Sequence, residues 1–344
     1  MRTLLIFTLL ALSVSVHAQW IKQTVDTTAS LRGLSVVSEK IVWASGTGGT
    51  VIRTIDGGKT WKVIHVAGAE KLDFRDIEAF DAKTAYILSI GNGESSRIYK
   101  TIDGGATWKE QFRNKNEKAF YDAMACWDKT RCVAMSDPVD EHFYVIVTHD
   151  GGRTWNTTAD NLLYAKEGEA AFAASGTCLI TTGKAGIFFV SGGNRARVFR
   201  TANQGWTWDF AETEMAKGTA GSGIFSIAMF DIKNGVIVGG NYEKPNEAKD
   251  NFAVTTDGGV TWKLGTGLSG YRSGVTYVDK NTIIAVGTNG SDISADGGKT
   301  WSRLDKENYN SVRALNSQSV WAVGAKGLVS KFHFRKDVYV KGLN

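Results

Sequence analysis

Six acid or amide side chains recur at one position of a repeated octapeptide, where they could serve catalysis or bind calcium. The copies are TIDGGKTW (54–61), TIDGGATW (101–108), THDGGRTW (148–155), TANQGWTW (201–208), TTDGGVTW (255–262) and SADGGKTW (294–301). An Asp in a turn accepts hydrogen bonds from backbone N–H groups, and Gly supplies backbone angles that other residues avoid. Asn203 replaces the acid in the fourth copy, which a turn tolerates and a catalytic acid would not. We therefore expect these side chains to stabilise hairpin turns.

Arginine recurs near the start of several apolar strands, and grouped guanidinium ions would suit a carboxylate, a phosphate or an acidic protein segment. We align six strand starts as LRGL, FRDI, FYDA, IFSI, YRSG and VRAL, whose second residues are Arg32, Arg75, Tyr121, Phe225, Arg272 and Arg313. If the chain closes into a ring, the four arginines fall in consecutive repeats and form a positive arc. Nearby acids could instead neutralise each arginine, and this alternative carries equal weight. The acids in question are Asp73, Asp76, Glu78 and Asp122.

Four adjacent repeats carry long segments at equivalent places, at residues 91–97, 136–143, 190–197 and 241–251. Long loops on a rigid scaffold often carry function, although any one of them could be an inert insertion. Arg195 and Arg197 lie in the third segment, GGNRAR, and could extend the basic rim. Because no helix follows this Gly-rich segment, it predicts neither a phosphate loop nor a dinucleotide site.

Hydrolysis is the main alternative chemistry, and Asp76, Asp122 and Asp137 are the acids to test for it. Ordinary glycosidases need two carboxylates roughly 5–10 Å apart, and nothing in the sequence pairs these three. The histidines lie in separate repeats without ligand spacing, and cofactor fingerprints are missing. We therefore expect no metal and no cofactor, we assign no catalytic residue, and we favour a binding protein over an enzyme.

The N-terminus predicts export. Arg2, an apolar stretch over 4–14 and small residues before Gln19 are typical of a signal peptide, residues 1–18, cleaved near Ala18. The stretch is too short to span a bilayer, so we expect an extracytoplasmic protein, periplasmic or secreted, without stable membrane insertion. In an oxidising compartment Cys126 and Cys132, which bracket a five-residue turn, could form a disulfide. Cys178 is then left over as a buried thiol.

The elements that position these residues are short strands. Each repeat of about 40–50 residues contains four apolar strands, of which the last begins at the Trp of the octapeptide, and this pattern is typical of a propeller blade. Seven blades can be counted over residues 19–334, and 335–344 form a short tail. The seventh blade lacks a fourth strand, and QWIK (19–22) resembles the strand after an octapeptide. We predict an all-β, seven-bladed propeller of four-stranded antiparallel blades, closed by its N-terminal strand and monomeric.

In such a ring the octapeptides occupy one face, so a partner is expected on the opposite face, where the arginines and long loops lie. The net charge of +5 in 344 residues is too small for a dedicated nucleic-acid binder. The predicted partner is a protein or another anionic ligand.

With these octapeptides, the blade count and the signal peptide, the chain resembles the photosystem II stability/assembly-factor-like family of seven-bladed propellers with BNR/Asp-box repeats. The resemblance covers about residues 20–334 and implies a scaffold that binds another protein through a basic surface, without catalysis. The matching residues are Arg32, Arg75, Arg272 and Arg313. Asp boxes also occur in sialidases and other glycoside hydrolases, so hydrolysis stays the alternative. The sialidase Arg-Ile-Pro element is missing here, where Phe74-Arg75-Asp76-Ile77 stands.

Overall fold

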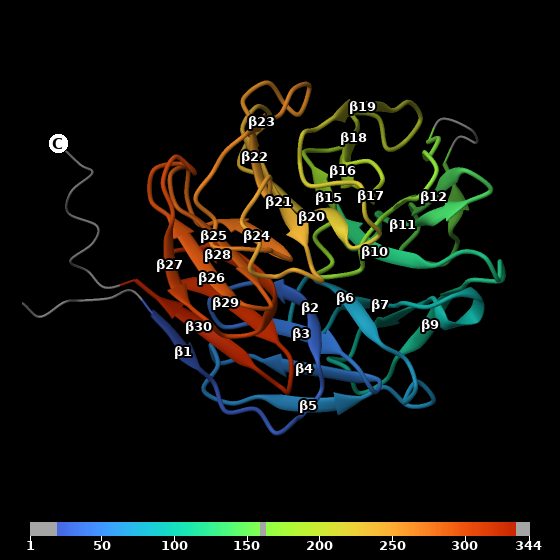
Figure 1. Cartoon of the computed structure of the whole chain (residues 1–344). Coiled ribbons are helices and arrows are strands. Elements are labelled where there is room, and N and C mark those ends of the chain that lie inside the picture. The colour runs from blue at the N-terminus through green and yellow to red at the C-terminus, as the bar shows by residue number, and fades with distance from the viewer. Residues whose placement is uncertain (1–18, 159–162, 335–344) are drawn as a thin grey trace, which may run out of the picture.

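The computed structural model describes residues 19–158 and 163–334, which fold into a seven-bladed β-propeller of antiparallel sheets (Figure 1). The predicted signal peptide and the predicted tail lie outside the described residues. Within each blade the chain runs outward from the central channel, so the first strand lines the channel. The fold class predicted from the repeats is confirmed.

The first three blades are regular four-stranded sheets. Blade 1 contains β2 (Leu31–Val36), β3 (Val42–Gly46), β4 (Thr50–Thr54) and β5 (Lys62–His65). Blade 2 contains β6 (Phe74–Ala79), β7 (Ala85–Ser89), β8 (Arg97–Thr101) and β9 (Lys109–Arg113), with a 3-10 turn, η1 (Gly93–Ser95), before β8. Blade 3 contains β10 (Tyr121–Cys126), β11 (Cys132–Val139), β12 (His142–Thr148) and β13 (Asn156–Thr157).

Blades 4 and 5 are joined by extra pairing on the face opposite the boxes. Blade 4 contains β15 (Leu179–Thr182), β16 (Gly186–Val190), β18 (Arg197–Thr201) and β19 (Asp209–Glu212). Blade 5 contains β20 (Ser222–Met229), β21 (Gly235–Asn241), β22 (Phe252–Thr255) and β23 (Lys263–Leu264). Two short strands, β14 (Glu169–Ala170) and β17 (Gly192–Gly193), extend the blade 5 sheet to six strands. Blade 4 is therefore the irregular repeat.

The ring closes as predicted, by the N-terminal strand completing the last blade. Blade 6 contains β24 (Gly274–Tyr277), β25 (Ile283–Gly287), β26 (Gly290–Ser294) and β27 (Ser302–Asp305). Blade 7 contains β28 (Tyr309–Asn316), β29 (Ser319–Gly324) and β30 (Val329–His333), and β1 (Gln19–Lys22) pairs with β30. Figure 1 shows β1, at the blue end of the chain, alongside the red β30. Trp20 packs edge-on against Phe332 with ring centroids 4.9 Å apart, which anchors the closing strand.

The octapeptide tryptophans pack against the preceding blade. Trp108 of blade 2 meets Trp43 of blade 1 at 6.4 Å, and Trp61 of blade 1 meets Trp321 of blade 7 at 5.6 Å. Both pairs are edge-to-face, a favourable geometry for aromatic rings. The repeated Trp thus stabilises the contacts between blades.

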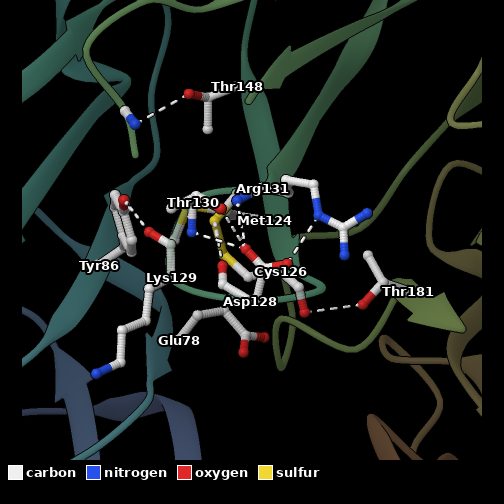
Figure 2. Close-up of a disulfide and its surroundings, with 12 residues drawn as sticks. Glu78, Tyr86, Met124, Cys126, Asp128, Lys129, Thr130, Arg131, Thr148 and Thr181 are labelled. Atoms are coloured by element: carbon white, nitrogen blue, oxygen red, sulfur yellow. Dashed lines mark hydrogen bonds and ion pairs between the residues drawn. A yellow bond between two sulfur atoms is a disulfide. The ribbon is translucent and has the colours of Figure 1, made fainter. Parts of the chain in front are cut away.

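Cys126 and Cys132 form a disulfide at the base of the β10–β11 turn (Figure 2). Within this turn Asp128 Oδ1 accepts hydrogen bonds from the N–H groups of Thr130 and Arg131 at 2.8 and 3.0 Å. Thr181 of blade 4 donates to the carbonyl of Cys126 at 3.0 Å. Cys178 is buried as a free thiol. The crosslink therefore fixes a turn that also contacts the next blade.

Candidate functional site

Strand register defines two faces of the ring. In blade 1 the box joins the end of β4 to the start of β5, whereas Leu31 at the start of β2 pairs with Gly46 at the end of β3. The channel strand therefore begins on the face opposite the box, which we call the mouth face. The sequence predicts that the arginines at the strand starts lie on the face opposite the boxes. The register agrees with this prediction for Arg32 and Arg75.

Five of the channel strands carry a β-bulge near their first residue. The register shifts by one residue in β2, β6, β10, β20 and β28. The extra residues, which we call the bulge ring, are Arg32, Arg75, Asp122, Phe225 and Asn310. A bulge changes the direction in which the side chain of the extra residue points. At this position the five blades therefore place different side chains at the channel mouth.

A short stretch of blade 4, residues 171–175, fills the channel mouth, and we call it the channel segment. The backbone N–H of Ala171 donates to Asp137 Oδ1 of blade 3 at 2.7 Å. Ser175 Oγ donates to the carbonyl of Ser273 at 2.7 Å, and Ser311 Oγ donates to the carbonyl of Ser175 at 3.2 Å. These bonds attach the segment to blades 3, 6 and 7. Gly176 follows at φ +73°, and a Cβ there would lie 2.5 Å from Asp76 Oδ1, so only glycine fits.

Arg32 and Arg75 fix the same segment from blades 1 and 2. Arg32 Nη1 donates to the carbonyl of Ala174 at 3.0 Å, and Arg75 Nη1 donates to the carbonyl of Ala173 at 3.1 Å. Arg75 Nε also donates to Asp73 Oδ2 at 2.8 Å. Burial, and then the charge of Arg75, lower the pKa of Arg32 from its usual value. Both side chains are partly exposed, and because they bind adjacent carbonyls the two guanidinium ions lie near each other at the mouth, with Asp73 beside Arg75.

The alignment of strand starts is wrong by one residue in blade 3 and by three residues in blade 7. In blade 3 the bulge residue is Asp122, and Tyr121 is buried against Phe112 with ring centroids 5.2 Å apart. In blade 7 the bulge residue is Asn310, and Arg313 lies three residues further along the strand. Arg313 Nη2 is 3.8 Å from Glu78 Oε1, so it forms an ion pair inside the channel.

Arg272 is in the predicted arc but is not available to a partner. Its side chain is fully buried, and its guanidinium donates to Asp292, Ser269, Asn289 and its neighbour's carbonyl. Because the acid Asp292 is also buried, this pair is internal architecture. Asp292 is not among the acids named from the sequence, whereas the pairs Arg75–Asp73 and Arg313–Glu78 are of the kind which that alternative described.

Arg197 of the predicted rim is likewise buried, in an ion pair with Glu169. Arg195, two residues earlier, is exposed. Of the rim and arc residues predicted from sequence, Arg32 and Arg75 are the ones that the structure brings together at the mouth.

Asp76 and Asp122 of the channel are fully buried, and Glu78 and Asp137 are half-buried. Asp76 accepts the N–H groups of Ile77 at 2.8 Å and Met124 at 2.7 Å, and burial raises its pKa well above the usual value. Burial also raises the pKa of Glu78 to about 7 and that of Asp137 to about 6. Burial, and then the charge of Asp137, raise the pKa of Asp122. Asp76, Asp122 and Asp137 are the acids predicted for hydrolysis, and the structure places Asp76 and Asp122 beneath the channel segment rather than in an open cleft.

The box carboxylates are bound by their own turns. Asp56 accepts hydrogen bonds from Thr60 Oγ1 at 2.6 Å, the Thr60 N–H at 2.9 Å and Thr54 Oγ1 at 2.8 Å. Bonds from Thr60 hold the pKa of Asp56 at about 2. In the fourth copy Asn203 accepts from the Thr207 N–H at 3.0 Å and donates to Thr207 Oγ1 at 2.8 Å. The amide therefore replaces the acid in a purely structural role.

A cavity of about 880 Å³ lies on the box face between blades 4 and 5, lined in part by Phe188, Arg200 and Ile232. Trp43 and Tyr86 bridge to the next blade by donating to the carbonyls of Asp81 and Lys129, at 3.1 and 2.9 Å. Phe188 stands at the corresponding register position of blade 4 but has no polar group.

Over residues 19–158 and 163–334 no cluster of three or more His, Cys, Asp or Glu side chains is arranged to hold a metal ion. Within the same stretches no helix has the length and apolar character needed to cross a membrane.

Comparison with known proteins agrees with the boxes and the blades. Residues 12–112 match the family model for the photosynthesis system II assembly factor YCF48, and residues 292–303 match the BNR/Asp-box repeat. No curated protein matches the chain in sequence.

Solved structures show the same fold. A structure of YCF48 bound to a D1 peptide is 16% identical, with a TM-score of 0.68 over 93% of this chain and 96% of that one. YCF48 from Cyanidioschyzon merolae is 18% identical, with a TM-score of 0.66 over 92% and 99%. A Niastella koreensis GH74 enzyme is 15% identical, with a TM-score of 0.61 over 91% of this chain and 53% of that one.

Fold and repeats together define the class as a seven-bladed Asp-box β-propeller. Within that class, the chain is similar to the photosynthesis system II assembly factor YCF48, in sequence over residues 12–112 and in fold over most of its length.

Proposed function

We propose that this protein is a non-catalytic, exported scaffold that binds an acidic segment of a partner protein on its mouth face. The observation that carries the proposal is the pair Arg32 and Arg75. A backbone carbonyl orients each guanidinium, and Arg75 also pairs with Asp73, whose charge offsets one of the two. Because a guanidinium binds carboxylates through paired N–H groups, two oriented guanidinium ions suit an acidic peptide.

Two further observations support this function. YCF48, which shares the fold, has been solved with a D1 peptide bound. Two of the three carboxylates proposed for hydrolysis are already hydrogen-bonded to the backbone: Asp76 accepts two N–H groups, and Asp137 accepts that of Ala171. Hydrolysis thus gains no support from their geometry.

A location outside the cytoplasm is part of the proposal. The disulfide between Cys126 and Cys132 supports it, because such crosslinks persist in oxidising compartments.

The experiment is fluorescence anisotropy with a labelled heptaglutamate peptide. Replacing Arg32 and Arg75 together with Glu should weaken binding by about 100-fold or more, since each charged hydrogen bond contributes about 1.5–3 kcal/mol. The control is Lys59→Glu with Lys299→Glu, which makes the same change in net charge at exposed positions on the box face. Equal losses in the two double variants, or no binding to the wild-type protein, would overturn the proposed function.

A further inference from the structure

Beside the two arginines the mouth carries a second surface, made of aromatic rings from blades 4, 5 and 6. Phe225, the bulge residue of β20, is its centre. Phe172 of the channel segment stacks on Phe225 with ring centroids 3.9 Å apart and planes 11° apart. Tyr271 and Tyr242 approach Phe225 edge-on at 4.8 and 6.2 Å. We call Phe172, Phe225, Tyr242 and Tyr271 the aromatic cluster.

The position of Phe172 is fixed by glycine on its far side. A Cβ on Gly192 would lie 2.3 Å from a ring carbon of Phe172, and a Cβ on Gly223 would lie 2.9 Å from it. Side chains at those two positions would displace the ring, so the close approach of β17 and β20 depends on glycine. The stack is therefore built into the extra pairing between blades 4 and 5.

Part of the cluster is accessible. Tyr242 is 47% exposed at the start of the long β21–β22 loop, and Phe172 is half-buried, whereas Phe225 and Tyr271 are buried beneath them. A phenol ring supported by packed aromatic side chains offers apolar area with little loss of conformational freedom on binding.

The aromatic cluster and the arginines adjoin each other. Arg32 binds the carbonyl of Ala174, which is two residues from Phe172 and so at most about 7 Å along the chain. The Tyr271 hydroxyl also lies close enough to the Arg32 charge for the two groups to influence each other's ionisation. The mouth thus has a cationic half, on blades 1 and 2, and an aromatic half, on blades 4 to 6.

We propose that the mouth recognises a partner segment in which a carboxylate lies within two or three residues of an aromatic side chain. The carboxylate binds Arg32 and Arg75, and the ring packs on Tyr242 and Phe172. This inference rests on the proposed function and adds the chemistry of the partner to it: charge alone does not select the ligand, because half of the surface is uncharged.

The test compares two labelled heptapeptides by fluorescence anisotropy with the full chain. Each has a central residue, phenylalanine in one peptide and alanine in the other, between two runs of glutamates. The phenylalanine peptide should bind about 3–10-fold more tightly, as expected for one additional aromatic contact. Tyr242→Ala should abolish that preference and leave the affinity for the alanine peptide unchanged.

The matched control is Trp206→Ala, which removes an exposed ring from the box face and should keep the preference. Replacing Arg32 and Arg75 together with Glu should weaken binding of both peptides equally, because the two peptides carry the same charge.

The outcomes separate the two proposals. Equal affinity of the wild-type protein for the two peptides, together with unchanged affinities in Tyr242→Ala, would overturn the proposed role of the aromatic cluster. The proposed binding of an acidic segment would remain supported. Failure of the wild-type protein to bind either peptide overturns both. Loss of the preference in Trp206→Ala as well would show that the rings act through stability, and would overturn the assignment to the mouth.

Discussion

The box face and the channel side of this propeller use carboxylates in opposite ways. On the box face, Asp56 and Asp103 are bound within four residues by Thr60 and Thr107, and their pKa values are held at about 2. On the channel side, Asp76 and Asp137 accept backbone N–H groups from 48 and 34 residues away, and burial raises their pKa values.

The difference separates what the repeats share from what each blade adds. A turn that satisfies its own hydrogen bonds can recur six times with little change and leaves little for a partner to recognise. The bulge ring occupies one structural position in five blades, yet it carries Arg, Asp, Phe and Asn. Function in a repeat protein is therefore best sought where equivalent positions differ.

Truncating the buried arginine of the channel side should have the largest effect on stability. Arg272→Ala leaves Asp292 buried without a counter-ion and should lower the free energy of unfolding by about 3–5 kcal/mol. Arg75→Ala, at a partly exposed ion pair, should lower it by about 1 kcal/mol or less. Urea unfolding followed by tryptophan fluorescence measures both.

The control replaces the whole pair, with Arg272→Met and Asp292→Leu, which removes the stranded charge and should recover most of the loss. Equal losses in Arg272→Ala and Arg75→Ala would show that the distinction between buried and accessible arginines is wrong.

The fold was predictable because its signals are local. Each octapeptide marks a turn by itself, and QWIK at residues 19–22 resembles the strand after a box closely enough to predict the ring closure. The mouth was only partly predictable. The hydrophobic pattern does not mark which residue is the bulge, so the alignment misses Asp122 by one residue in blade 3 and Asn310 by three residues in blade 7.

The channel segment and the aromatic cluster had still weaker signals. The segment reads AFAAS, and its bonds to Arg32, Arg75 and Asp137 join residues far apart in the chain, so no spacing in the sequence marks them. Phe225 is aligned correctly, but its place in the aromatic cluster depends on stacking with Phe172, which lies more than 50 residues earlier in the chain. Tyr242 opens a loop that was predicted to be functional, and an exposed aromatic residue there was the one available signal.

Substitutions in a box should have a smaller effect that depends on hydrogen bonding rather than on charge. Asp103→Ala removes the acceptor for Thr107 and should lower Tm by roughly 2–4 °C, as expected for the loss of one local turn interaction. Asp103→Asn should retain most of the stability, because Asn203 fills the same position in the fourth box. Differential scanning calorimetry would distinguish the two. Equal losses would mean that the box needs charge, and the contrast between the faces would then disappear.

The smallest expected effect is the pH dependence of Tm. It reports on the channel carboxylates alone, because the box carboxylates do not titrate in the range measured. Between pH 5 and 8 the box acids stay ionised, since their pKa values near 2 lie below this window. Glu78 and Asp137 differ, because burial raises their folded-state pKa values to about 7 and about 6 from ordinary values of 4.5 and 3.8. A raised carboxyl pKa stabilises the folded state at low pH, and that stability is lost as the pH rises through the folded-state value.

We therefore expect Tm to fall from pH 5 to pH 8, and Glu78→Gln to reduce the fall by roughly 1–2 °C. His333 acts in the opposite direction, because burial lowers its pKa and a lowered histidine pKa favours folding as the pH rises. Measuring in a His333→Gln background removes that contribution. Asp103→Asn is the matched control: it deletes a box carboxyl that stays ionised throughout the window, so the slope should not change. A Tm that rises with pH in this background would show that burial does not raise the pKa values of the channel acids. The contrast between the box face and the channel side would then be wrong.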